Sequence, residues 1–209
     1  MTLVLVDAAG EPAGELPPFE VSTPWWHDVS EFGSRVAELP GAPSRGVQVL
    51  RLLSADRPAP PGGAVTYLAQ LDDGGPGRAI GAAAAAAAKA LTGSAAGPGG
   101  HPRRPPYAEP GGPDASIAWA RAALGRPELA ARQQRTWNLS AIWRLDEADG
   151  TPVAWLKQVP WFFAHEAAAI GLVAAVAPGL TPPVLAAGEP GRLLMAHLAG
   201  GDCWDAGPE

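Results

Sequence analysis

The sequence contains a single cysteine, Cys203, among its 209 residues. An intrachain disulfide and a cysteine-cluster metal site are therefore both excluded, and this composition fits a reducing, cytoplasmic compartment. Charged residues make up only 17% of the chain and the net charge is −6, so no positive field would attract nucleic acid or an anionic membrane. No apolar run reaches the roughly 18–20 residues that a membrane-spanning helix needs. We therefore expect a cytoplasmic protein with neither nucleic-acid nor membrane partners.

Bulky apolar side chains are nearly missing from residues 76–113, which consist largely of alanine, glycine and proline. Such a segment has little apolar surface with which to offset the entropy lost on ordering. It is predicted to be a low-complexity linker. The chain would then be an α+β protein with a small module at residues 1–75 and a second unit at residues 114–209.

The module at residues 1–75 shows mixed periodicity. Residues 2–7 alternate as a strand, residues 24–39 have apolar side chains at helical spacing, and "GVQVLRLLS" and "GAVTYLAQLDD" read as two further strands. No catalytic constellation is evident, because His27 and Asp28 are adjacent and would point about 100° apart on a helix. The pattern indicates a small α+β module of unknown role, used for recognition or as a scaffold.

The unit at residues 114–209 has a clearer order of elements. A helix capped by Asp114 is expected to end at Gly125. The stretch "TWNLSAIWRLDEADGTPVAWLKQVP" then predicts a hairpin, because two runs rich in aromatic and β-branched residues flank a turn sequence. A helix from about residue 161 to 176 follows, and two more strands surround the turn "GEPG".

One lysine and one glutamate stand out in "TPVAWLKQVPWFFAHEAAAI". Lys157 lies at the end of a strand pattern, and Glu166 lies at the head of the following helix. An ammonium on a rigid strand is suited to orient the phosphates of a nucleotide, and a carboxylate from a neighbouring helix can hold it. We expect the two side chains to form an ion pair. The alternative is a strand-edge lysine facing water and a glutamate that only complements the helix dipole.

This order of elements resembles the N-terminal lobe of the kinase-like fold, and in detail the aminoglycoside and small-molecule phosphotransferase family. The matching stretches are "QRTWNLSAIWRL", "VAWLKQVPWFFAHEAAAI" and "GRLLMAHLAGGDCW". The resemblance implies an ATP-dependent kinase that, with Mg²⁺, transfers a phosphoryl group to a hydroxyl of a small molecule. It also assigns nucleotide contacts to Lys157 and Glu166, to Asn138 and Ser140 in a phosphate-covering turn, and to the backbone from Ala196 to Leu198 at the adenine edge.

The family's second lobe carries the catalytic aspartate, a following asparagine and a later aspartate that holds Mg²⁺. Only "DAGPE" follows Trp204, and Asp202 and Asp205 lack the expected His-Gly-Asp context. The sequence therefore predicts a truncated chain without catalytic residues or metal ligands, and one prone to self-association through the exposed face of its lobe. The alternatives are a non-catalytic nucleotide-binding or regulatory module and a plain structural or interaction protein.

Overall fold

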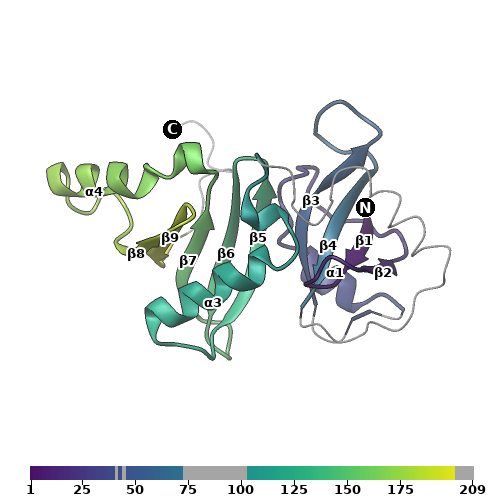
Figure 1. The fold of residues 1–209 in the computed structure, drawn as a ribbon, viewed down its shortest axis with the longest axis horizontal. Coiled ribbons are helices and arrows are strands. Elements are labelled where there is room, and N and C mark those ends of the chain that lie inside the picture. The colour runs from purple at the N-terminus through teal and green to yellow at the C-terminus, as the bar shows by residue number, and fades with distance from the viewer. Residues whose placement is uncertain (41, 44–45, 73–102, 201–209) are drawn as a thin grey trace.

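In the computed structural model, which describes residues 1–40, 42–43, 46–72 and 103–200, the chain is an α+β protein built on two sheets. Four strands in the order β2-β1-β4-β3 form the N-terminal sheet, and five strands in the order β5-β6-β7-β9-β8 form the second, which we call the lobe sheet. Figure 1 shows α3 lying across the lobe sheet and α4 projecting from its far end, away from the N-terminal sheet. The described elements are β1 Thr2–Val6, β2 Pro12–Glu15, α1 Phe32–Ala37, β3 Val47–Ala55, β4 Val65–Leu71, the 3-10 turn η1 Pro106–Ala108, α3 Gly112–Leu124, β5 Ala130–Trp137, β6 Ser140–Asp146, β7 Pro152–Gln158, the 3-10 turn η2 Trp161–Phe163, α4 Glu166–Val176, β8 Val184–Gly188 and β9 Arg192–Ala196.

The N-terminal sheet confirms the three strands expected in residues 1–75, as β1, β3 and β4. Strand β1 pairs with β4 in parallel, while the β1–β2 and β3–β4 pairs are antiparallel. Helix α1 packs on this sheet through its buried residues Phe32 and Val36. The rings of Phe32 and Tyr67 pack in a T-shaped arrangement. These contacts form the core of the N-terminal part of the chain.

The helix expected over residues 24–39 is wrong in its length, because α1 spans only Phe32–Ala37. The preceding residues instead contact strand β5. The backbone N–H of Val29 donates to the carbonyl of Gln134, and the N–H of Thr136 donates to the carbonyl of His27. Hydrogen bonds to β5 thus replace the helical hydrogen bonds expected in this stretch. Such tertiary contacts commonly override the helix that a local sequence pattern predicts.

The lobe sheet confirms the hairpin expected in residues 136–160, as β6 and β7, and the two strands around "GEPG", as β8 and β9. The helix expected from about residue 161 divides into η2 and α4. Strand β5 was missed by sequence reasoning. Its sequence, "AARQQRTW", shows no alternation of apolar side chains because this edge strand lies half-buried between the two sheets.

Helix α3 covers one face of the lobe sheet and forms the second core with it. Its buried residues Ile117 and Ala120 belong to the same apolar cluster as Trp143, Leu156 and their neighbours on the strands. The expected cap at Asp114 is wrong: Gly111, with φ 79°, precedes the helix, and Asp114 lies in its first turn. There the Asp114 carboxylate accepts a hydrogen bond from the Gln70 side chain at 2.6 Å.

Buried glutamine side chains connect the two sheets. The Gln133 amide accepts from the Val49 N–H at 2.7 Å and donates to the Val49 carbonyl at 2.8 Å, completing the edge of β3. The Trp143 indole N–H donates to Gln48 at 2.8 Å, and the Gln70 amide group accepts from the Gly111 N–H. The sheets therefore meet through specific polar contacts as well as through apolar packing.

Most of the segment expected to be a linker lies outside the described residues. Its last part is described and packs against both sheets: the Tyr107 ring is buried, and the Ala108 carbonyl accepts a hydrogen bond from Arg51 at 2.8 Å. The division of the chain into residues 1–75, 76–113 and 114–209 stays a prediction. The unfolding of a Trp143→Ala variant tests it.

We expect Gln133→Leu to lower the free energy of unfolding by about 1–3 kcal/mol, because it leaves the N–H and C=O of buried Val49 without partners. Chemical denaturation followed by circular dichroism measures the change. The matched control is Gln134→Leu, since Gln134 makes only an exposed, local side-chain hydrogen bond. Equal effects of the two substitutions would contradict the role assigned to Gln133.

Candidate functional site

Lys157 and Glu166 form the ion pair that the sequence predicts. The Lys157 Nζ lies 2.5 Å from the Glu166 Oε1, and the two side chains are 25% and 30% exposed. The lysine comes from the end of β7 and the glutamate from the first residue of α4. Lys157 is also one of only two lysines in the chain. The pair is thus half-buried, held on two elements, and accessible from solvent.

The alternation of side chains between the two faces of β7 explains why Lys157 faces away from α3. Ala154, Leu156 and Gln158 are buried, and the first two belong to the core formed with α3. Because successive side chains on a strand point to opposite faces, Trp155 and Lys157 lie on the other face. That face is the one not covered by α3.

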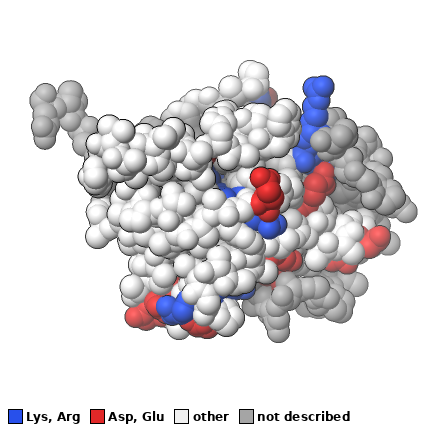
Figure 2. Space-filling view, turned by 60° about the vertical axis from the view of Figure 1, so that its left-hand side comes forward, with Lys and Arg blue, Asp and Glu red and all other residues white. Residues whose placement is uncertain are grey.

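Helix α4 has no buried residue, although its sequence is almost entirely apolar. Leu172 is 72% exposed and Val176 is 87% exposed, while Trp161 in the preceding turn is 76% exposed. Figure 2 shows this end of the molecule as a surface with few charged side chains. The helix is positioned mainly by its contact with β8 and by the Lys157–Glu166 pair.

Asn138 and Ser140 lie at the turn between β5 and β6, at the same end of the sheet as Lys157. The register places Ala141 opposite Gln158, so Ser140 begins β6 beside the end of β7. Within the described part of the chain, no hydrogen bond joins either side chain to Lys157. Asn138 lines a separate cavity that faces the N-terminal sheet. The phosphate contacts of Asn138 and Ser140 remain predictions.

The segment from Ala196 to Leu198 follows β9 and uses part of its backbone internally. The Ala196 N–H donates to the Pro183 carbonyl at 2.9 Å, and the His197 N–H donates to the Val153 carbonyl at 3.1 Å. Of the three N–H groups, that of Leu198 is the one without a hydrogen-bond partner among the described residues. An adenine edge at this segment would therefore depend on the Leu198 N–H and on the carbonyl groups.

A small hollow of about 180 Å³ lies beside this segment. Its walls include Trp155, whose indole N–H donates to the His197 Nδ1 at 3.0 Å, with the two rings stacked. Sequence reasoning missed Trp155 and the ring contact with His197. Strand alternation could have found Trp155, which lies two residues before Lys157 and therefore on the same face. The other walls of the hollow are Pro182, Met195, Ala196 and Leu198.

The hollow and the ion pair lie at opposite ends of a continuous strip of the sheet. Lys157 is opposite Leu193, and Ala154 is opposite Ala196. Three residues of strand separate the two positions, which corresponds to about 10 Å. A cation at one end and an apolar hollow with a free backbone donor at the other can accommodate a ligand that is anionic at one end and aromatic at the other.

The described residues do not provide a metal centre. Within residues 1–40, 42–43, 46–72 and 103–200, no group of three or more histidine, cysteine, aspartate or glutamate side chains could hold a metal ion. These residues therefore offer no cluster of side chains that would hold a metal ion by itself. Asp202 and Asp205 lie outside the described residues.

Comparison with known protein families, curated proteins and solved structures found no match to this chain. The candidate site therefore depends on the geometry of the chain itself. In the described part of the chain, no helix is long and apolar enough to span a membrane.

Proposed function

We propose that the unit at residues 114–209 is a nucleotide-binding lobe of the kinase-like phosphotransferase type, in which Lys157 orients the phosphates of ATP. The observation that carries this proposal is the Lys157–Glu166 ion pair on the open face of the lobe sheet. In kinases, a strand lysine held by a helix glutamate contacts the nucleotide phosphates, and this pair must be in place for activity. In kinases and in the proposed site alike, the fixed positive charge of a lysine faces the concentrated negative charge of the phosphates.

The topology of the lobe sheet supports the same proposal. In the strand order β5-β6-β7-β9-β8, the last strand, β9, lies between β7 and β8, so that β8 is at the edge. Helix α4 connects β7, the third strand of this sheet in the sequence, to β8, the fourth. This is the order of elements expected for a kinase-like N-terminal lobe, with the lysine on the third strand and the glutamate on the helix. The hollow beside Ala196 and Leu198 lies where that arrangement would bring the adenine.

The proposed reaction is transfer of the ATP γ-phosphoryl group to a hydroxyl of a small molecule. An acceptor hydroxyl must be oriented and its proton received by a base, and the described residues show neither group at this site. The part assigned to this chain is binding: Lys157 would neutralise phosphate charge and Glu166 would hold Lys157 in position. In a complete homologue, the catalytic base and the substrate site would lie in the second lobe, as the family resemblance implies.

A second candidate, a non-catalytic interaction module, is favoured by the exposed apolar surface of α4. An apolar helix without buried residues is unusual in a soluble monomer and marks a surface that another protein segment contacts. If the chain is instead a phosphotransferase lobe, a second lobe or a second copy of the chain would pack on this surface and on the open face of the sheet. Nucleotide binding separates the two candidates.

We expect the chain to bind ATP weakly, and Lys157→Met to lower that affinity by about tenfold through loss of one charge-assisted contact. Ligand-observed NMR titration with ATP measures both affinities. The stability of the fold should change by no more than about 1 kcal/mol, because an ion pair that solvent still reaches contributes little. Glu166→Gln should cause a smaller loss of affinity, since it retains a hydrogen-bond acceptor for Lys157.

Arg35→Gln is the matched control, because it removes an exposed cation from α1 on the N-terminal sheet. Its ATP affinity should equal that of the unmodified chain. If Lys157→Met and Arg35→Gln have the same affinity for ATP, the proposed role of Lys157 is wrong and the interaction-module candidate is favoured.

A further inference from the structure

A cavity of about 540 Å³ lies between the N-terminal sheet and the turn that joins β5 to β6. Its volume falls within the range of roughly 300–1,000 Å³ that is typical of small-molecule sites. The cavity does not include Lys157, Glu166 or the segment after β9. Its walls come from β3, β4, the loop between them, the segment before α3 and the end of β5. The cavity is therefore separate from the Lys157–Glu166 pair and from the segment after β9, although Asn138, to which the family resemblance assigns a phosphate contact, is among its lining residues.

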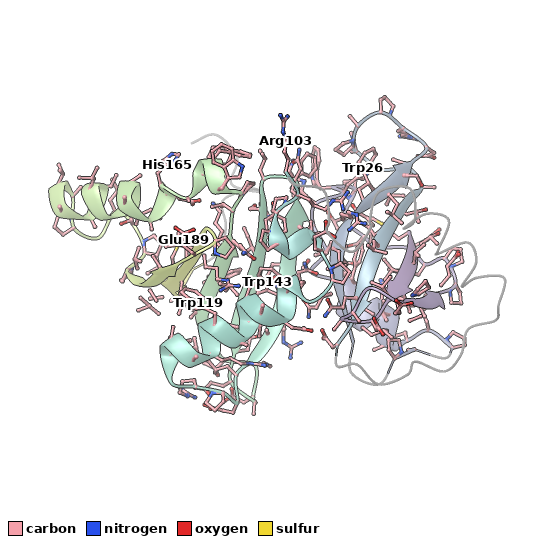
Figure 3. All side chains as sticks on the ribbon, in the orientation of Figure 1. Trp26, Arg103, Trp119, Trp143, His165 and Glu189 are labelled. Carbon is pink, nitrogen blue, oxygen red and sulfur yellow. The ribbon has the colours of Figure 1, made fainter. Side chains whose placement is uncertain are left out.

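The walls are mainly aromatic and aliphatic. Trp26, Leu50 and Tyr67 are almost fully buried and form the inner part, whereas Leu52 and Trp137 are each 41% exposed and lie at the opening. The polar atoms of the inner rings already have partners. The Trp26 indole N–H donates to the Gly62 carbonyl at 2.7 Å, and the Tyr67 hydroxyl donates to the Trp26 carbonyl. Figure 3 shows Trp26 on the N-terminal part of the molecule. These rings present their apolar surfaces to a ligand.

Two arginines give the cavity a positive wall. Arg51 and Arg104 both line it, with side chains only 14% and 16% exposed, and both contact the same carboxylate, Glu109. Two cations and one anion leave one positive charge in excess. Among the described lining residues there is no aspartate or glutamate. The cavity thus combines an apolar interior with a single uncompensated positive charge.

Arg51 retains donors for a further acceptor. Its hydrogen bonds to described residues, the Ala108 carbonyl and Glu109, both use Nη1. Burial, and then the neighbouring Arg104, lower the pKa of the Arg51 guanidinium, and Glu109 only partly opposes them. An anion placed beside Arg51 would relieve the unfavourable electrostatics of this wall.

Thr136 provides an independent indication of a ligand. It lines the cavity at the end of β5, and the residue is 4% exposed. Its hydroxyl is buried and has no hydrogen-bond partner among the residues that the structure describes. A buried hydroxyl without a partner is costly, whereas a bound polar group would satisfy it.

We propose that this cavity binds a small organic monoanion with a planar apolar body, such as an aromatic carboxylate. The planar body lies between Trp26 and Trp137, the carboxylate lies beside Arg51, and the Thr136 hydroxyl donates to it. A neutral analogue would lose the arginine contact, and a dianion would exceed the single positive charge available. This site gives the N-terminal sheet a binding role separate from ATP.

The test compares 2-naphthoate with its neutral analogue 2-naphthamide, by ligand-observed NMR titration of the full chain. We expect the carboxylate to bind at least about tenfold more tightly than the amide, since the amide lacks the charge-assisted contact with Arg51. Thr136→Val should weaken naphthoate binding by about three- to tenfold, the loss of one hydrogen bond. Equal affinities for the carboxylate and the amide would overturn the proposal.

Three further variants separate binding at the cavity from folding and from other surfaces. Ala59→Trp, at an exposed position of the lining loop, should fill the opening and abolish naphthoate binding without disturbing the core. Arg57→Gln removes an arginine of the same loop that does not line the cavity, and it should leave the affinity unchanged. Lys157→Met should also leave it unchanged, which keeps this test independent of the nucleotide site. Unaltered binding in Ala59→Trp would show that naphthoate binds elsewhere and would refute the proposed site.

Discussion

Trp143→Ala is expected to lower the free energy of unfolding by about 3–5 kcal/mol, the largest stability effect we expect in this chain. The Trp143 side chain is completely buried on the face of the lobe sheet that α3 covers, where Figure 3 labels it. Its truncation would leave a large cavity among Ile117, Leu145 and their neighbours. It would also leave the Gln48 Oε1 of β3 without its donor. Thermal and chemical denaturation measure the loss.

The same variant tests whether the N-terminal sheet and the lobe sheet unfold together. Because Trp143 packs in one core and hydrogen-bonds to the other sheet, a single unfolding transition that shifts as a whole would indicate one cooperative unit. Two transitions, only one of which shifts, would indicate two independent modules as predicted from the sequence. Trp143→Phe isolates the hydrogen bond, since it retains most of the apolar volume, and Trp161→Ala is the exposed control. If Trp161→Ala destabilises the fold as much as Trp143→Ala, the core assignment is wrong.

Gly112→Ala should be the second most damaging substitution, with an expected loss of about 1–3 kcal/mol from overpacking. A Cβ at this position would lie 1.7 Å from the Pro106 carbonyl oxygen, which belongs to backbone and cannot rotate away. Turn η1 and the start of α3 would have to move apart. That movement would displace Tyr107 from the core and shift the Ala108 carbonyl that Arg51 contacts. Denaturation measures the stability, and naphthoate affinity should fall in the same variant.

Gly171→Ala is the matched control, because Gly171 lies within α4 and a Cβ there would meet nothing within 4 Å. Alanine is a better helix former than glycine, so this change should stabilise the fold by about 0.5–1 kcal/mol. The two glycine-to-alanine substitutions are therefore expected to have opposite signs. A destabilisation by Gly171→Ala equal to that of Gly112→Ala would contradict the close approach of η1 and α3.

The candidate site was predictable where it depended on a single strand and its neighbouring helix. The position of Lys157 at the end of a strand pattern and of Glu166 at the start of a helix was enough to predict their ion pair. The hydrogen bonding of the segment from Ala196 to Leu198 was less accessible to prediction, since the partners of the Ala196 and His197 N–H groups, Pro183 and Val153, come from other segments. The cavity beside Arg51 could not be anticipated, because residues distant in the sequence form its walls.

The sequence by itself determined the α+β class, the hairpin of β6 and β7, and the strands β1, β3 and β4, because local alternation and turn residues specify these elements. Only the tertiary structure decided how the sheets meet. Strand β5 has too few apolar residues to be recognised, and it forms because its backbone pairs with β6 and Gln133 completes the edge of β3. Likewise, residues 27–29 lie in a stretch with helical spacing but pair with β5 instead. A hydrogen bond between distant segments has no local signature, so contacts of this kind appear only once the chain is folded.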